Sequence, residues 1–163
     1  MTAPSATERT NVIFVADRAA RLAVIAEHPE AGIVTEGLPL RANLSVLENI
    51  ALVPRYRRNL DETTSTGLAW RLLDRVGFTG CAMQRDPDLD HEERFVTKLL
   101  QAVLLDTPLI LIDRPALLLP DTPYPAFLDR VLGALDGEFE HCTILDYAWN
   151  APLYPPRASA ISA

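Results

Sequence analysis

Lysine is almost missing from this sequence: fourteen of its fifteen basic residues are arginine, and Lys98 is the single lysine. Cysteine and histidine are scarce too. Cys81 and Cys142 form no CxxC pair, and three histidines leave a metal cluster few candidate ligands. No apolar run reaches the roughly 18 residues of a membrane-spanning helix, and residues 1–10 lack the basic start and apolar stretch of a signal peptide. We therefore predict a cytoplasmic protein without a metal or another cofactor.

The sequence contains hydrophobic and charged residues in the proportions of an ordinary globular protein. Of its 163 residues, 48% are hydrophobic and 23% are charged, which is enough apolar surface to build a core. The length favours one domain, because domains usually have roughly 100–150 residues. The net charge of −7 repels phosphate backbones, so we predict no nucleic-acid partner.

The first regular elements indicate a strand, a helix and a second strand. Asn11–Ala16 is a short, β-branched apolar run, and Gly32–Thr35 is another. Between them Arg18–Glu27 has helical spacing, for which the apolar face is predicted at Ala19, Leu22, Ile25 and Ala26. A right-handed crossover would pair the two strands in parallel.

Two capping boxes predict helix starts, one formed by Ser45 with Glu48 and one by Asp90 with Glu93. Between them Asp61–Val76 also has helical spacing. Further along, the sequence predicts strands at Leu109–Asp113 and Cys142–Asp146, separated by a helix at Tyr124–Leu135. This alternation of strand and helix indicates an α/β protein with a parallel sheet.

Three segments, in this order, resemble the ATP-binding subunit of ABC transporters. Asn43–Tyr56 is similar to the stretch after that family's glutamine loop, Asp74–Leu105 to its signature motif and following helix, and Asp106–Pro115 to its Walker B strand. The resemblance implies a truncated P-loop NTPase-like fold, a three-layer parallel sheet with a small helical lobe at about 44–88. It places this single domain at 11–150, between a flexible N-terminus at 1–10 and a C-terminal tail at 151–163.

The departures from this family affect its nucleotide-handling motifs. The family's phosphate loop, GxxxxGK[ST], wraps phosphates with backbone N–H groups and its lysine. Here the corresponding turn offers only Asp17 before Arg18, without a glycine, and Lys98 lies in another helix. We predict that Asp17 caps the following helix, so that this helix end is not open to a phosphate. Asp113 keeps the Walker B acid, but Arg114 follows where active members have a glutamate, and a guanidinium cannot accept a proton from water.

The other motif positions are altered as well. Glu36 stands in place of the glutamine and Tyr147 in place of the switch histidine. The signature motif lacks both glycines and reads Leu89, Asp90, His91, Glu92, Glu93. The resemblance therefore implies a scaffold without catalytic residues and without a nucleotide site.

Several of these residues allow a structural interpretation beside a functional one. Asp113 could bind a metal, but a cap or an ion pair with Arg114 is favoured. Asp90, His91, Glu92 and Glu93 suit helix capping and complementation of the helix dipole better than metal binding, because consecutive residues at a helix start point in different directions. For Leu117–Leu119, burial and a protein contact are both open. We interpret Cys81 and Cys142 as buried or idle thiols.

The favoured function is a pseudo-subunit or regulator in an ABC transport system. Its partners would be a membrane subunit, an intact ATP-binding subunit or both, with a homodimer as a further option, in the cytoplasm or at the inner face of the membrane through a permease. One alternative is an ATPase subunit with an unorthodox nucleotide site, and another is a free-standing α/β interaction module. Arg55, Arg57 and Arg58 form a basic patch that suits either an anion or acidic partner loop, or plain exposure to solvent. The predicted contact residues are Glu36, Leu38, Leu40, Asn43, Arg55, Arg57 and Arg58.

Overall fold

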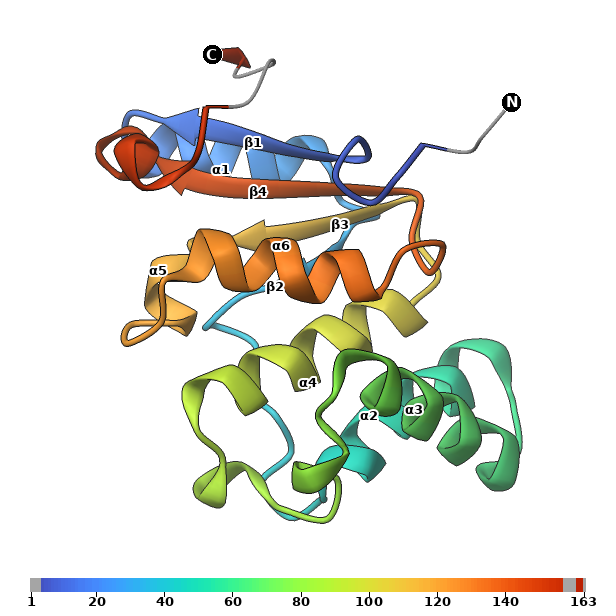
Figure 1. Ribbon diagram of the computed structural model, residues 1–163. Coiled ribbons are helices and arrows are strands. Elements are labelled where there is room, and N and C mark those ends of the chain that lie inside the picture. The colour runs from blue at the N-terminus through green and yellow to red at the C-terminus, as the bar shows by residue number, and fades with distance from the viewer. Residues whose placement is uncertain (1–3, 157–160, 163) are drawn as a thin grey trace.

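The computed structural model describes residues 4–156 and 161–162 (Figure 1). The strands are β1 Thr10–Val15, β2 Gly32–Val34, β3 Leu109–Asp113, β4 His141–Tyr147 and β5 Ile161–Ser162. The α-helices are α1 Arg18–Glu27, α2 Val46–Arg58, α3 Glu62–Val76, α4 His91–Leu104, α5 Pro115–Leu118 and α6 Tyr124–Ala134. Short 3-10 helices lie at Thr79–Cys81, Asp86–Asp88 and Ala148–Leu153.

All strands pair in parallel, in the order β2-β3-β4-β1-β5. Ile144 of β4 pairs with Val12 on one side and Ile112 on the other, so β4 separates β1 from β3. The sequence-based prediction of an α/β fold with a parallel sheet is confirmed. Because every strand runs the same way, all their carboxyl ends meet at one edge of the sheet.

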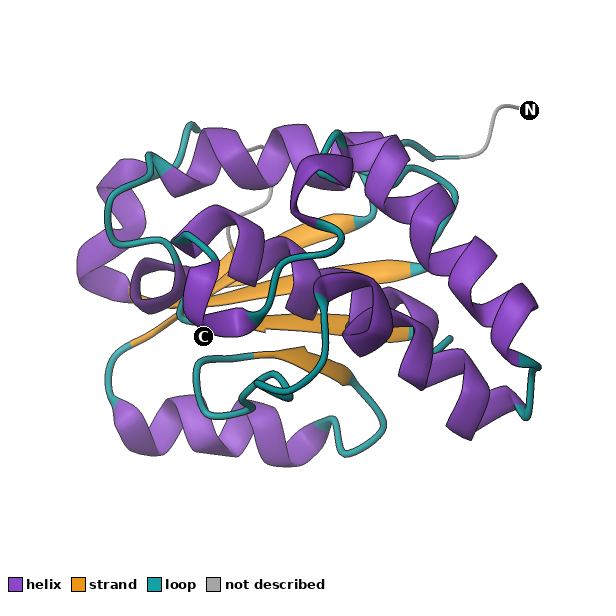
Figure 2. Ribbon diagram, turned by 90° about the horizontal axis from the view of Figure 1, so that it is seen from below, coloured by secondary structure: helices purple, strands orange, loops and turns teal. Residues whose placement is uncertain are grey.

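Helices cover both faces of the sheet, as a parallel sheet requires. Leu111 and Leu145 point to one face, where Val24 of α1 packs on them. Ile110 and Ile144 belong to the larger core on the opposite face, together with side chains of α4 and α6. Figure 2 shows the strands between one helix on one side and the remaining helices on the other. The helices α2 and α3 pack against α4 and complete a helical lobe (Figure 1).

The buried face of α1 agrees with the predicted one only at Ile25. Ala20, Val24 and Ile25 pack on the sheet. Leu22 is 44% exposed, and Ala19 and Ala26 are exposed as well. Apolar residues lie all round this short helix, so the spacing is compatible with two faces. The ion pair between Arg21 of α1 and Asp113 selects between these two faces.

Both predicted capping boxes are confirmed. The Ser45 hydroxyl accepts from the Glu48 N–H at 3.2 Å, and the Glu48 carboxylate accepts from the Ser45 N–H at 2.7 Å. The Asp90 and Glu93 pair makes the same reciprocal bonds at 2.8 and 3.0 Å. Each box satisfies two N–H groups that a helix start leaves unpaired.

Ordered structure extends into the segment expected to be a C-terminal tail. The 3-10 helix Ala148–Leu153 enters it, and Tyr154 packs against the core. At the other end, Arg9 forms an ion pair with Asp136. Residues 1–3 of the predicted flexible N-terminus, and residues 157–160 and 163 of the predicted tail, lie outside the described residues.

Candidate functional site

The candidate site lies at the carboxyl edge of the sheet, where open parallel sheets usually place their ligands. Asp113 ends β3, Thr35 follows β2, and Tyr147 ends β4. Asp17 follows β1 and precedes α1. The topology thus brings together residues that the sequence separates by up to 130 positions.

Asp113 is the centre of a buried ion pair. Its Oδ2 accepts from Arg21 Nη1 at 2.7 Å and from the Thr35 hydroxyl at 3.0 Å. The Asp113 side chain is 1% exposed and that of Arg21 is 9% exposed. Arg114, the expected partner, is more exposed, and its Nε lies farther from Asp113 Oδ2, at 3.4 Å. Asp113 thus forms an ion pair, as the structural interpretation predicted, but its main partner is Arg21.

Two atoms of this ion pair lack a hydrogen-bond partner among the described residues. They are Asp113 Oδ1 and Arg21 Nε, and both are buried. The charges of the two groups nevertheless offset each other inside the protein. A charged side chain contributed by α1 therefore already occupies the space beside Asp113.

Arg114 adopts a left-handed backbone conformation, with φ of 52°. This conformation costs a residue with a Cβ about 1 kcal/mol. The Arg114 N–H donates to the Leu145 carbonyl at 2.9 Å, which holds the turn from β3 into α5 against β4. Its guanidinium accordingly lies at the position after the Walker B-like strand, beside Asp113.

The turn between β1 and α1 is closed by its own side chain. Asp17 Oδ1 accepts from the Ala20 N–H at 2.9 Å, which confirms the predicted N-cap. A helix N-terminus binds anions through free N–H groups and its positive dipole end. Here one of those groups and the favourable position for negative charge are taken by Asp17.

The residues at the signature position are used within the chain. Leu89 is buried, and Asp90 and Glu93 form the capping box of α4. Glu92 accepts from the Thr122 hydroxyl at 3.0 Å, whereas His91 is exposed. The described residues contain no group of three or more potential metal ligands.

The single lysine belongs to the same edge of the sheet, which sequence reasoning missed. Lys98 Nζ donates to the Thr35 carbonyl at 2.8 Å and to the Glu36 carbonyl at 3.4 Å. Lys98 is only 7% exposed, and burial lowers the pKa of its ammonium group. The available signal was its position among the apolar residues Phe95, Val96, Leu99 and Leu100, because a cation there must be buried.

Asp146 forms a second polar centre at the end of β4, also missed. It accepts from the hydroxyls of Tyr124 and Tyr154 at 2.9 Å each, from Asn150 at 2.9 Å and from the Tyr147 N–H at 2.8 Å. Burial, together with the Asp146 carboxylate, raises the pKa of both tyrosine hydroxyls. This network fixes the 3-10 helix at 148–153 to the sheet.

Tyr147, which we predicted to stand in place of the switch histidine, lies beside an exposed aromatic ring. Its side chain stacks on that of Trp149 with 4.2 Å between ring centroids. Trp149 is 66% exposed. The Tyr147 ring is thus held by stacking at the carboxyl end of β4.

Most of the predicted contact residues are on the surface. Glu36, Leu38 and Asn43 are exposed, as are the three arginines at 55, 57 and 58. Leu40 was predicted wrongly, since it is 7% exposed and belongs to the core. Among the three leucines after β3, Leu118 and Leu119 are buried and Leu117 is 49% exposed.

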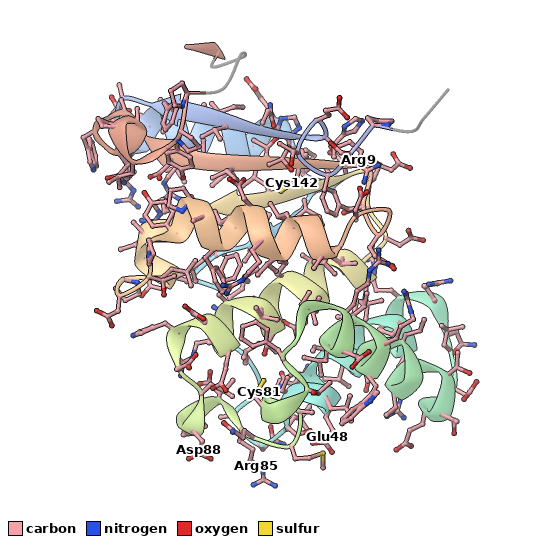
Figure 3. The ribbon with its side chains drawn as sticks, in the orientation of Figure 1. Arg9, Glu48, Cys81, Arg85, Asp88 and Cys142 are labelled. Carbon is pink, nitrogen blue, oxygen red and sulfur yellow. The ribbon has the colours of Figure 1, made fainter. Side chains whose placement is uncertain are left out.

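A groove of about 440 Å³ lies between α2 and the loop that precedes Asp86, and Arg55 is the predicted contact residue that lines it. Its charged rim is made by Glu48, Arg55, Glu62 and Arg85, and its apolar part by Leu44, Leu47, Ala51, Leu52 and Met83. Figure 3 shows Glu48 and Arg85 close together at the lower end of the molecule, far from Arg9. The groove offers an apolar strip bordered by charges of both signs.

Solved structures with a similar fold are ATP-binding cassettes of ABC transporters. The ATP-binding cassette MJ0796, in a dimeric post-hydrolysis state bound to ADP and Pi, is 21% identical with a TM-score of 0.58, over 74% of this chain and 53% of that chain. A further dimeric structure of MJ0796, a bacterial ABC transporter cassette, is 18% identical with a TM-score of 0.58, over 78% of this chain and 57% of that one.

CbiO1 from Clostridium perfringens, part of the ABC transporter complex cbiONQ, is 11% identical with a TM-score of 0.68, over 90% of this chain and 69% of that one. The chain thus spans little more than half the length of the MJ0796 cassette. No protein-family model matches the chain, and no curated protein matches it. Within the described residues, no helix has the length and apolar character needed to cross a membrane. The similarity to the three solved cassette structures establishes the P-loop NTPase-like fold.

Proposed function

We propose that this chain is a non-catalytic relative of the ABC transporter ATP-binding cassettes and acts as a pseudo-subunit or regulator in an ABC transport system. Its fold, shared with such cassettes, supports the relationship. The ion pair between Arg21 and Asp113 supports the loss of catalysis. The positive charge that a nucleotide-bound metal would bring to Asp113 comes from the chain itself, at 2.7 Å.

Two further features of the site support the same proposal. A phosphate needs free backbone N–H groups, but Asp17 caps α1 and adds negative charge at that position. A hydrolytic reaction needs a base near the attacking water, and Arg114 cannot serve as one. The chain would therefore act through what it binds, with the sheet as a scaffold.

The proposed contact surface comprises the exposed residues after β2 and the groove beside α2. We assign to the groove a short amphipathic helix of a membrane subunit or of an intact ATP-binding subunit. Its apolar side would cover the strip that includes Leu47 and Met83. Acidic residues at its ends would face Arg55 and the neighbouring exposed arginines Arg57 and Arg58.

Calorimetric titration with Mg²⁺ and a non-hydrolysable ATP analogue tests the loss of nucleotide binding. Concentrations up to the millimolar range reveal sites as weak as about −4 kcal/mol. We expect no saturable heat from this chain and saturable heat from an intact ATP-binding cassette titrated in parallel. Saturable binding to this chain would instead support the ATPase alternative.

Photo-crosslinking in the native host tests the contact surface. A benzophenone amino acid replaces Met83, which is 74% exposed in the groove, and in a matched variant it replaces Trp149, which is 66% exposed on the 3-10 helix after β4 and does not line the groove. We expect the Met83 variant alone to form an adduct that mass spectrometry identifies as an ABC permease or ATP-binding subunit. Adducts from neither position, or equally from both, would favour the free-standing module.

A further inference from the structure

A second pocket, of about 260 Å³, lies between the turn after β2, the start of α4 and α5. Its apolar wall includes Pro39, Phe95 and Leu117. Its polar side chains come mainly from α4 and the short 3-10 helix before it. This pocket is separate from the groove beside α2, with which it shares no lining residue.

Lys98 supplies a buried ammonium group to this pocket. It makes two hydrogen bonds, to the carbonyls of Thr35 and Glu36, and an ammonium group has three donors. One N–H therefore remains for the pocket that the side chain lines. A buried ammonium is costly to desolvate, so an apolar side chain would fill this place in α4 more cheaply if packing were its only role.

Arg94 supplies a second cation with unused donors. Its Nε donates to Asp86 Oδ1 at 2.7 Å, and its Nη2 to the carbonyls of Asp86 and Leu89 at 2.8 and 3.1 Å. Its Nη1 has no hydrogen-bond partner among the described residues. The charge of Arg94 also lowers the pKa of Lys98, whereas Asp86 and Glu36 raise it. Two cations thus line one pocket, in which Asp86 is already paired.

The lining also limits the charge of a ligand. Glu36 and Asp86 both border the pocket, so a dianion such as phosphate would meet repulsion that a single negative charge largely avoids. The volume is below the roughly 300–1,000 Å³ of sites for drug-sized ligands, which suits a ligand of about ten non-hydrogen atoms.

We propose that this pocket binds a small monocarboxylic acid. Its carboxylate accepts hydrogen bonds from Lys98 Nζ and Arg94 Nη1, and its apolar part lies against Pro39 and Leu117. His91, which is exposed, also lines the pocket. This proposal does not depend on the role in transport, because it rests on the pocket alone.

The single lysine makes a direct test possible. Protein labelled biosynthetically with ¹³C-lysine gives one Cε signal, that of Lys98, without altering its donors. Benzoate is the probe, and benzamide is the neutral control of the same shape. We expect benzoate to shift the signal saturably and to raise the pKa of Lys98, and benzamide to do neither.

A matched pair of variants locates the binding. Leu117→Trp fills the pocket from an exposed position and leaves both cations in place. Leu22→Trp adds the same bulk at a comparably exposed leucine on α1. We expect at least tenfold weaker benzoate binding in L117W and unchanged binding in L22W. Both variants change exposed residues, so the test does not depend on replacing buried Lys98.

Four results would overturn the proposal. The first is a benzoate shift that grows linearly without saturation, and the second is an equal response to benzamide. The third is unchanged affinity in L117W. Tighter binding of inorganic phosphate than of benzoate would overturn the assignment to a monocarboxylate.

Discussion

Arg21 Nη1 lies 2.7 Å from Asp113 Oδ2, although the two residues are 92 positions apart in the chain. Asp113 ends β3, and Arg21 reaches it from the helix that follows β1, with β4 between those two strands. The ion pair therefore ties α1 to the carboxyl end of the sheet across a neighbouring strand. Both side chains are almost fully buried, so solvent screens this pair little.

Removing one member of the pair should be strongly destabilising. We expect Arg21→Met to lower the free energy of unfolding by about 3–5 kcal/mol, because it leaves the Asp113 carboxylate buried without its cation. Urea denaturation followed by circular dichroism measures this. Arg18→Met, at an exposed position of the same helix, should change the value by less than about 0.5 kcal/mol.

Replacing both members separates the cost of an unpaired charge from the worth of the pair. The double variant Arg21→Met with Asp113→Leu should recover most of the loss, since a buried pair can often be replaced by apolar residues of similar volume. A double variant no more stable than Arg21→Met would show that the pair itself holds α1 in place.

The hydrogen bond from Tyr154 to Asp146 should stabilise the packing of the C-terminal segment. We expect Tyr154→Phe to lower the free energy of unfolding by about 1–2 kcal/mol, because a buried carboxylate loses one of its donors. Tyr56→Phe is the matched control, since Tyr56 is 81% exposed. Equal effects of the two substitutions would contradict the role assigned to the network.

Glu138 connects the helical lobe to the loop after α6 and should make the stability depend on pH. A hydrogen bond from Arg71, with the charges of Arg71 and Arg75, holds the pKa of its carboxyl below the ordinary value of 4.5. The folded protein then binds fewer protons here than the unfolded chain does. This contribution is fully present above the unfolded pKa and is lost as the pH falls through the folded pKa.

The measurement compares the unfolding free energies of the wild type and Glu138→Gln over a range of pH. We expect a difference that stays constant from pH 7 to about 5 and shrinks at lower pH. A difference that does not change with pH would mean that the carboxylate adds nothing through its charge.

Cys81 should be unreactive while the protein is folded. It is 2% exposed, and burial raises the pKa of its thiol to about 11, with a smaller contribution from the charge of Glu93. At pH 8 only about one thiol in a thousand is then ionised. We expect no labelling of Cys81 or the buried Cys142 by a thiol reagent without denaturant, and two labels in urea. Fast labelling of the native protein would contradict this.

Predictions from the sequence succeeded where a structure depends on residues a few positions apart. The capping boxes at Ser45 and Asp90 and the N-cap at Asp17 were predicted, because such contacts link a side chain to a backbone group three residues away. The β-branched runs predicted the central strands for a similar reason. The parallel sheet then followed from the alternation of strands and helices.

The contacts that define the site could not be predicted in this way. Spacing within α1 allowed two buried faces, and the pairing of Arg21 with Asp113 selected one of them. Lys98 was counted from the sequence, but its carbonyl partners come from the turn after β2, and the Asp146 network joins α6, β4 and the segment after it.

The sequence by itself determined the helix caps, the strands and the fold class, because these depend on local periodicity and on backbone groups nearby in the chain. Only the tertiary structure decided which charges are neutralised inside the protein and which cations keep free donors. The physical reason is that parallel strands bring their carboxyl ends to one edge, where residues from distant parts of the chain meet.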